Sequence, residues 1–392
     1  MVFWDCGRVP VFRPEETMER SKVYFTDFRT KNGVSQGTKL QRLCRAAGIS
    51  QIDFEGKFAA IKMHFGELGN FAYIRPNYVK AVADLIKELG GVPFLTDCNT
   101  LYPGSRKNAV DHLNVAEING FNSVTTGCHV IIADGLRGTD DIEVKVPGGE
   151  YCKTALIGRA LMDADILISL SHFKGHECAG FGGAIKNIGM GGGSRAGKMQ
   201  QHNDGKPIVH TELCRSCRRC AGECGSDAIS YKEKGKAFID PELCKGCGRC
   251  IGACPFDAIE NINSNANEVL CYKMAEYTAA ICHNRPHFHI SLIMDVSPNC
   301  DCHSENDAPI LPNLGMLASF DPVAIDQAGA DLCQKAVPIR NSQLGDNLAS
   351  PGWVSYNDHF LDNNPSVRWK EALSHGEKLG LGTRDYELVT LP

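Results

Sequence analysis

The chain has 392 residues, of which 43% are hydrophobic and 22% are charged, and its formal net charge is −5. This length accommodates two or three domains of ordinary globular composition. The charge excludes a globally positive field that would attract nucleic acid or an anionic membrane. No run of about 18 apolar residues predicts a membrane-spanning helix. We therefore expect neither nucleic acid nor a membrane among the partners.

The amino terminus and the cysteines indicate where the protein works. Residues 1–8 lack the charged start and apolar stretch of a secretory signal, so we expect a cytoplasmic protein, unless a partner exports it. Disulfide frameworks belong to small secreted chains, which this is not, although it contains 19 cysteines. Eight cysteines follow one strict pattern, and the scattered ones are expected to pack as small buried hydrophobes. So many thiols fit a reducing cell, and an anaerobic one in particular.

The first half of the chain alternates between strand and helix patterns. Residues 77–89 carry apolar side chains at helical spacing, and Gly90-Gly91 ends that helix. The near-continuous apolar strands predict an α/β fold with a Rossmann-like parallel sheet covered on both faces. The expected strands are 21–25, 58–64, 93–97, 130–133 and 165–170, and the expected helices are 38–47, 77–89 and 154–162.

Polar side chains gather where these strands end. His64, Asp97 and His172 follow three of the strands, and ligands of parallel sheets bind outside the carboxyl ends of the strands. We expect the three to complete a pocket there. Capping and turn formation are the alternative roles for His64 and Asp97.

Residues 171–202 combine many glycines with lysines and histidines directly after a predicted strand. Glycine lets backbone N–H groups approach a ligand closely. Lys186 is expected to hold an anion, and His176 and His202 to exchange protons or bind a metal. The alternative is a glycine-rich loop with incidental histidines. The expected cofactor-binding residues are Lys174, Gly180, Gly182, Gly183, Gly191 and Gly192.

Residues 206–262 differ from the rest and repeat internally at a spacing of thirty residues. Each half contains Cys-x2-Cys-x2-Cys-x3-Cys, the pattern of bacterial ferredoxins with two [4Fe–4S] clusters, in which the fourth cysteine ligates the other cluster. Zinc is the alternative, but it does not explain two strict four-cysteine runs in tandem. The predicted ligand sets are Cys214, Cys217, Cys220 and Cys254 for one cluster and Cys244, Cys247, Cys250 and Cys224 for the other.

The α/β pattern resumes after this inserted α+β dicluster ferredoxin module. Pro322 occupies the first turn of an expected helix. Residues 300–303, Cys-Asp-Cys-His, follow a predicted strand and suggest a metal site, a redox pair or a plain loop. The expected elements are helices 268–281, 321–332 and 367–376 and strands 287–296 and 315–320, with a loop-rich stretch from residue 344. The predicted domains are 1–205, an α/β domain with the Gly-Lys-His residues; 206–262, the ferredoxin module; and 263–392, a C-terminal α/β completion.

The chain resembles domain-of-unknown-function family 362, whose members often carry a ferredoxin module. The resemblance runs through residues 62–67, Asp97, residues 171–202 and residues 319–322. The spacing from His176 through Lys186 to His202 is also distantly similar to the nickel-pincer lactate racemase family. That resemblance implies a cofactor-bearing lysine at Lys186, a nickel-binding histidine at His202, a proton-exchanging histidine at His176 and a substrate-binding arginine at Arg75.

The sequence therefore predicts an iron–sulfur oxidoreductase. A redox partner protein or a small reductant would load the clusters, which would pass electrons to an anionic small molecule or a second cofactor in the pocket. Because clusters carry single electrons, two-electron chemistry would require a flavin or an additional metal there. One alternative is a non-enzymatic electron-transfer or maturation protein that serves a partner enzyme. Another is a nickel-pincer-type isomerase.

Overall fold

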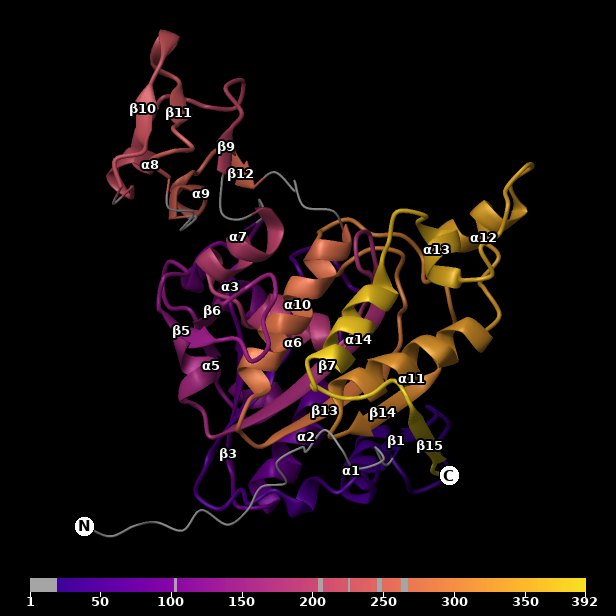
Figure 1. The fold of residues 1–392 in the computed structure, drawn as a ribbon. Coiled ribbons are helices and arrows are strands. Elements are labelled where there is room, and N and C mark those ends of the chain that lie inside the picture. Colours follow the sequence, from indigo (N-terminus) through magenta and orange to yellow (C-terminus); the bar gives the residue numbers. More distant parts are fainter. Residues whose placement is uncertain (1–19, 102–103, 204–206, 225, 245–248, 262–266) are drawn as a thin grey trace.

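The computed structural model describes residues 20–101, 104–203, 207–224, 226–244, 249–261 and 267–392. Its centre is a nine-stranded sheet with the strand order β15-β1-β14-β13-β7-β2-β3-β4, and β8 pairs with β7 (Figure 1). The strands are β1 (Ser21–Thr26), β2 (Phe58–Lys62), β3 (Val92–Asp97), β4 (Val130–Ile132), β7 (Ile166–His176), β8 (Gly180–Gly182), β13 (His287–Ile293), β14 (Gly315–Ser319) and β15 (Tyr386–Thr390).

The sheet is mostly parallel. Five strands run parallel to one another in the spatial order β4, β3, β2, β7 and β13. Strand β15 runs parallel to β1. Strand β14 runs antiparallel to both β13 and β1. The expected α/β fold with a large parallel sheet is therefore confirmed in its main part. The chain on both sides of the inserted segment contributes strands to this one sheet.

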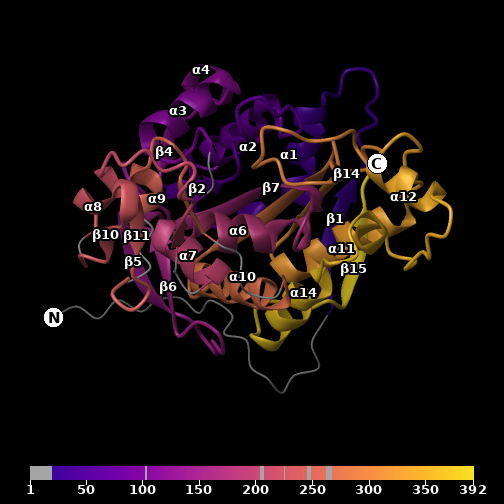
Figure 2. The ribbon, with the colours of Figure 1, turned by 90° about the horizontal axis from the view of Figure 1, so that it is seen from above.

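Helices cover both faces of the sheet (Figure 2). One face packs against α1 (Gln36–Ala46) and α2 (Pro76–Glu88), and the other against α6 (Ala184–Gly192), α10 (Asn267–Cys282), α11 (Pro322–Lys335) and α14 (Trp369–Lys378). Within β2, Ala59 and Ile61 join the first core, whereas Ala60 joins a core on the opposite face. Burial on both faces explains why the strands read as nearly continuous apolar runs.

The remaining elements of the α/β part lie around this sheet. They are η1 (Ile49–Gln51), α3 (Ala109–Ile118), α4 (Ser123–Thr126), β5 (Asp141–Lys145), β6 (Thr154–Gly158), α5 (Arg159–Asp163), α7 (Arg195–Asn203), α12 (Gln343–Ala349) and α13 (His359–Asn363). No helix in the described ranges is long and apolar enough to cross a membrane.

One prediction for this part was wrong, and one alternative does not hold. Residues 154–162 do not form one helix: β6 pairs antiparallel with β5, and only then does the short helix α5 begin. Ala155 and Ile157 are buried at alternate positions, which is the period of a strand. The prediction of one helix over residues 154–162 overlooked this alternation. Residues 171–202 do not form one glycine-rich loop, which was the alternative to a binding site: β7 continues to His176, β8, α6 and α7 follow, and these four elements contain seven of the nine glycines.

The cysteine-rich segment forms its own small unit beside α7 (Figure 1). Two short antiparallel pairs build it, β9 (Pro207–Val209) with β12 (Ile259–Asn261) and β10 (Ile229–Tyr231) with β11 (Ala237–Ile239). Between them lie α8 (Arg219–Gly222), η2 (Glu233–Gly235) and α9 (Arg249–Ala253). The thirty-residue repeat is visible in the backbone, because Asp227 and Asp257 share a positive φ of 51° and 50°.

Candidate functional site

A pocket with about 830 Å³ of empty volume lies at the carboxyl ends of β2 and β3 and along the extended end of β7. The three residues expected there from their strand-end positions, His64, Asp97 and His172, all line it. The other predicted site residues that line it are Lys174, His176, Gly182, Gly183, Lys186, Gly191 and His202. The structure thus brings together side chains from positions 62 to 302 of the chain.

Strand β7 contributes three of these side chains at alternate positions. His172, Lys174 and His176 share one face of the strand because successive side chains point to opposite faces. Phe173 between them lies in the apolar core with no exposed surface. The alternation of polar and apolar residues at 172–176 was visible in the sequence and is the signal that the strand continues.

The amino-terminal end of α6 holds Lys186 in the pocket. Asp326 of α11 accepts hydrogen bonds from the backbone N–H groups of Ala184 (2.6 Å) and Ile185 (2.9 Å). A Cβ atom on Gly183 would overlap the Asp326 carboxylate. Glycine at this position therefore serves the close approach of α6 to α11, and it also lines the pocket.

The other predicted glycines divide between two roles. Gly182 and Gly191 line the pocket, and a Cβ atom on Gly191 would overlap the ammonium group of Lys62. Gly180 and Gly192 do not line it. Gly180 has φ +82° and packs against Trp369, whereas Gly192 packs against Ile281 and Leu161.

The predicted Arg75 also lies elsewhere, and one residue that the sequence did not reveal takes part. Arg75 occupies the N-cap position of α2 and forms an ion pair with Asp295 (3.0 Å), outside the residues that line the pocket. Arg106 lines the pocket, is buried, and pairs with Glu67 (2.9 Å). No local pattern in the sequence distinguishes Arg106 from an exposed loop arginine, because its burial depends on the tertiary fold.

Buried carboxylates hold the pocket cations in place. Lys62 Nζ lies 3.0 Å from Asp97 Oδ1, and Lys174 Nζ lies 2.8 Å from Asp301 Oδ1. Burial would raise the pKa of Asp97, but the charges of Lys62 and His64 hold it well below its usual range. Burial also lowers the pKa of Lys62, which Asp97 partly offsets. Such pairs fix the cations but leave little net charge.

Asp301 is a hub within this network. Its Oδ2 atom lies 3.0 Å from His172 Nδ1, and its Oδ1 atom lies 3.5 Å from His64 Nδ1. Burial raises the pKa of this carboxyl, but His64 and Lys174 lower it well below its usual range. Asp301 therefore stays ionised and orients groups from two strands around the pocket.

Cys300 and Cys302 flank Asp301, and Cys300 contacts Lys186. Lys186 Nζ lies 3.2 Å from Cys300 Sγ. The hydrogen bond from the Cys302 thiol, with Lys186 and Lys174, lowers the pKa of Cys300 despite burial. The same hydrogen bond and burial raise the pKa of Cys302. Burial alone would lower the pKa of Lys186, but the negative charge at Cys300 and Cys302 raises it.

The histidines of the pocket differ in what they offer a ligand. His176 Nδ1 accepts backbone hydrogen bonds from Cys178 (3.1 Å) and Ala179 (3.0 Å), so the neutral ring carries its proton on Nε2, which faces Cys300. The Nδ1 atom is therefore occupied, and Nε2 is the ring nitrogen that remains to face the pocket. Burial lowers the pKa of His64 to about 4 and that of His202 to about 3, so both rings are neutral at pH 7.

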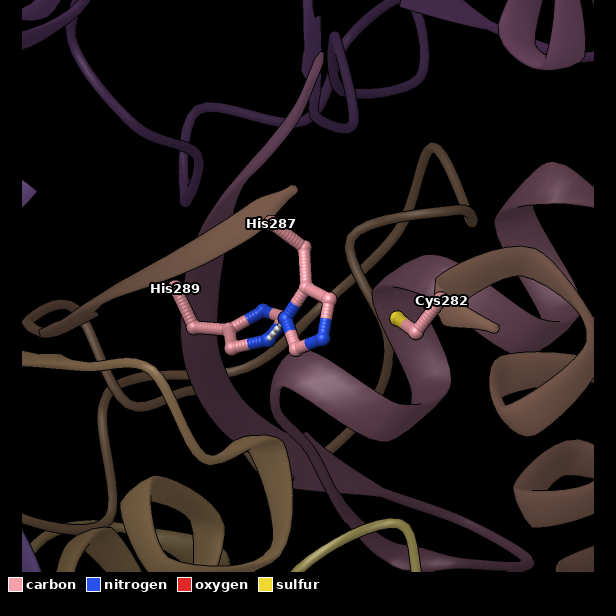
Figure 3. A group of neighbouring side chains, drawn as sticks. All are labelled: Cys282, His287 and His289. Carbon is pink, nitrogen blue, oxygen red and sulfur yellow. Dashed lines mark hydrogen bonds between the residues drawn. The ribbon is translucent and has the colours of Figure 1, made fainter. Parts of the chain in front are cut away.

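Among the residues that the structure describes, two groups of His, Cys and Glu side chains have ligand atoms close enough to hold a metal ion. Glu177, Cys302 and His303 place their ligand atoms within 4.8 Å of one another at the pocket. The second group lies at the amino-terminal end of β13, away from the pocket. There His287 and His289 lie side by side, and Cys282 faces them from the end of α10 (Figure 3). His289 bonds Ser169 (2.9 Å) through one ring nitrogen and His287 (2.9 Å) through the other. The second group is therefore already satisfied as a polar network.

The cysteines of the small unit gather as the sequence predicts for the first ligand set. Cys214, Cys217, Cys220 and Cys254, which come from both half-repeats, line one cavity with about 330 Å³ of empty volume. The backbone N–H of Ala258 points at Cys254 Sγ (3.4 Å), and that of Ala228 points at Cys224 Sγ (3.3 Å). Cys224, Cys244 and Cys250 of the second set are described, whereas Cys247 lies outside the described residues.

The small unit packs against the wall of the pocket. Leu101 and Met199 join the same apolar cluster as four of the cysteines, and Leu101 also lines the pocket. Lys107 Nζ donates a hydrogen bond to the Cys254 carbonyl (3.2 Å) and pairs with Asp257. The cysteines in this cluster are Cys214, Cys220, Cys250 and Cys254.

Comparisons with known proteins identify a family but no function. Residues 59–331 match the family model described as "Domain of unknown function (DUF362)". No curated protein sequence matches the chain. The lactate racemase apoprotein from Thermoanaerobacterium thermosaccharolyticum is similar in structure at 12% identity with a TM-score of 0.37, covering 70% of this chain and 51% of that one. A protein from Thermotoga maritima gives 10% identity, a TM-score of 0.39, and coverage of 76% and 57%. The chain thus spans little more than half the length of these structures.

Proposed function

The chain belongs to the DUF362 family, since the match spans more than half of its length, and we propose that this member is an iron–sulfur oxidoreductase. Two [4Fe–4S] clusters in the cysteine-rich unit would supply single electrons, and the pocket would hold the substrate. The observation that carries the proposal is the shared cavity of Cys214, Cys217, Cys220 and Cys254, cysteines that lie up to 40 residues apart in the sequence.

The spacing of these thiols supports a cluster in preference to zinc. Within the described part of the chain, no three of them lie within 4.8 Å of one another. A tetrahedral zinc with Zn–S bonds of about 2.3 Å would bring its thiolates to roughly 3.8 Å. A cubane is larger, and its ligands are correspondingly further apart. The N–H groups of Ala228 and Ala258 that point at cysteine sulfurs are the kind of hydrogen bond that tunes cluster potential.

The pocket residues support chemistry on a small anion. Lys174 and Lys186 present ammonium groups whose positions are fixed by Asp301 and Cys300. His176 directs a ring N–H toward the same group of side chains. Water is largely excluded from these groups, which strengthens their interaction with an anion. The chain's own contribution is therefore to bind and orient an anionic substrate and to supply a proton.

The test begins with metal and sulfide analysis of protein purified without oxygen. We expect about eight irons and eight sulfides per chain. Cys220→Ser should lower both to about four. Cys333→Ser is the matched control, because Cys333 is a buried cysteine of α11 outside the cysteine pattern, and it should leave the iron unchanged. Zinc in place of iron would overturn the proposal.

A second measurement separates the pocket from the clusters. Lys186→Ala should retain the full iron content. Anionic organic acceptors should no longer reoxidise the reduced variant, and this reoxidation is measured as the return of cluster absorbance. Unchanged reoxidation would show that the pocket is not the site of reaction. Nickel together with a covalent adduct on Lys186 would instead favour an isomerase.

A specific surface feature favours a second candidate, electron delivery to a partner enzyme. Leu213 and Leu243 occupy matching positions in the two half-repeats and are 44% and 51% exposed. Exposed apolar side chains on the small unit suit docking of a redox partner protein. Reduced protein that passes electrons rapidly to one partner, and to no small anion, would support this candidate over the oxidoreductase.

A further inference from the structure

Cys300 and Cys302 lie two residues apart on one loop beside Lys186, whose Nζ is 3.2 Å from Cys300 Sγ. Each of the two thiols shifts the pKa of the other. Cys300 is fully buried, whereas Cys302 is partly buried and lines the pocket. We propose that Cys300 and Cys302 interconvert between a thiolate–thiol pair and a disulfide, and thereby store two electrons next to the bound substrate.

Cationic and donor groups around Cys300 favour its thiolate, against one carboxylate oxygen, Asp301 Oδ1, at 3.6 Å from the sulfur. Lys186 Nζ lies 3.2 Å from its sulfur, and the Nε2–H of His176 and the Cys302 thiol both donate to it. The Cys300 backbone N–H is directed at Glu177 Oε2 (3.3 Å), which fixes the loop. A thiolate held by an ammonium group is the reactive form of cysteine in thiol–disulfide chemistry. At the buried Cys44, by contrast, burial outweighs the charge of Arg45 and raises the pKa of the thiol to about 12.

The electron balance of the step is simple. On oxidation, the Cys300 thiolate and the Cys302 thiol lose two electrons and one proton and form an S–S bond. The electrons go to the substrate, an anionic two-electron acceptor, and the substrate or solvent takes the proton. On reduction, two electrons and one proton break the S–S bond and restore the thiolate–thiol pair. The one-electron reductant that the proposed function already requires supplies the electrons one at a time.

This inference rests on the proposed function and removes a difficulty in it. Iron–sulfur clusters carry one electron at a time, whereas most reductions of small organic anions need two. A dithiol pair accumulates both electrons without a flavin. Its position is suitable, because Cys302 faces the pocket whose wall includes Leu101, a residue that also packs against the cysteine-rich unit.

A divalent metal is the competing reading of the same loop. Glu177, Cys302 and His303 have the right ligand types and lie within 4.8 Å of one another. The ammonium group of Lys186 interacts with Cys300, Cys302 and Glu177. A metal at these ligands would lie beside that positive charge, and would compete with Cys300 for the sulfur of Cys302. The contacts therefore favour the dithiol.

The experiment counts electrons and maps thiols in the intact protein. Wild-type protein is treated anaerobically with diamide, desalted, and titrated with reduced methyl viologen. We expect about four electrons per chain, two for the clusters and two for the disulfide. Cys300→Ser and Cys302→Ser should each take up about two while they keep all their iron. Cys128→Ser, which changes a buried cysteine far from the pocket residues in sequence, should still take up four.

Peptide mass mapping gives an independent readout. After diamide, the segment that contains Cys300 and Cys302 should resist alkylation and become alkylatable on reduction. Two free thiols after diamide, or equal electron uptake in wild type and both serine variants, would overturn the inference. One equivalent of a divalent metal that is lost in both Cys302→Ser and His303→Ala would overturn it in favour of a metal site. Failure of the proposed function would appear as absent iron. In that case reduction of the diamide-treated protein with a phosphine still shows whether the disulfide forms, so the two failures can be distinguished.

Discussion

The buried pair of Lys62 and Asp97 gives the sharpest test of how the pocket is held together. Lys62 Nζ lies 3.0 Å from Asp97 Oδ1, and the two side chains are 1% and 4% exposed. Unit charges at this distance attract by about 5.5 kcal/mol at an effective dielectric constant of about 20. Most of this offsets the cost of removing both charges from water. Removing only one partner therefore leaves an uncompensated charge.

We expect Lys62→Met to lower the free energy of unfolding by about 3–5 kcal/mol. Asp97 would retain one backbone hydrogen bond from Cys98 (2.9 Å). Asp97→Asn should cost less, because Lys62 keeps Asn187 Oδ1 (3.0 Å) and the Met63 carbonyl (3.3 Å) as acceptors. Since burial lowers the pKa of Lys62, its ammonium can also lose its proton in that variant.

The assay is urea unfolding under anaerobic conditions, followed by circular dichroism. The double variant Lys62→Met/Asp97→Leu should cost less than the sum of the single changes, since it leaves no buried charge. Lys80 and Asp84 form the matched control: their atoms lie 2.9 Å apart, but the side chains are 50% and 37% exposed. Lys80→Met should cost only about 0.3–0.5 kcal/mol. Equal costs for Lys62→Met and Lys80→Met would refute the reasoning.

Two further predictions concern the glycines of α6 and the buried histidines. Gly189→Ala should lower the thermal midpoint through about 1–3 kcal/mol of overpacking, since its Cβ would overlap the Met274 carbonyl. Gly191→Ala should lower the midpoint less than Gly189→Ala, because its Cβ meets the far end of the Lys62 side chain instead of backbone, but it should slow reoxidation by anions because it displaces the Lys62 ammonium. The opposite ranking would contradict the glycine roles. His64 and His202 have pKa values of about 4 and about 3 in the fold, below the unfolded value. The free energy of unfolding that is present above pH 6.5 is therefore lost as the pH falls. Each of the two histidines should lower it by about 2 kcal/mol between pH 7.5 and pH 5. A free energy of unfolding that stays constant over that range would disprove the prediction.

Strand ends were the part of the site that the sequence could predict. His64, Asp97 and His172 share the pocket because parallel strands place their carboxyl ends at one edge of the sheet. That inference needs only the order of apolar runs and turns. It succeeded without any knowledge of which strands are neighbours, because every parallel strand of one sheet ends at the same edge.

The glycines and the arginine were less predictable for physical reasons. Glycine suits both ligand approach and close helix packing, and the choice depends on which side of α6 each residue faces. Gly191 faces Lys62 and the pocket, whereas Gly192 faces Ile281 and the core. The Arg106 side chain pairs with Glu67, 39 residues away in the sequence. Such contacts are set by the tertiary fold and leave no local period in the sequence.

The Cys-Asp-Cys-His residues show how tertiary contacts decide between readings of a weak motif. In the sequence, residues 300–303 were compatible with a metal site, a redox pair or a plain loop, and the weak motif favoured the loop. In the fold, Lys186 of α6 lies against Cys300, and Lys174 of β7 lies against Asp301. Two lysines from other elements favour anionic groups at this loop, namely a thiolate and a carboxylate, and disfavour a bound cation.

The point of insertion of the cysteine-rich unit explains why it adjoins the pocket. Helix α7 carries His202, which lines the pocket, and Met199, which packs with the cysteines. The unit begins a few residues after this helix, with β9, and its last strand β12 contacts α7. A short connection limits how far the unit can lie from His202. Insertion at this position therefore places cysteines near the pocket wall, a placement that an appended domain on a long linker would not secure.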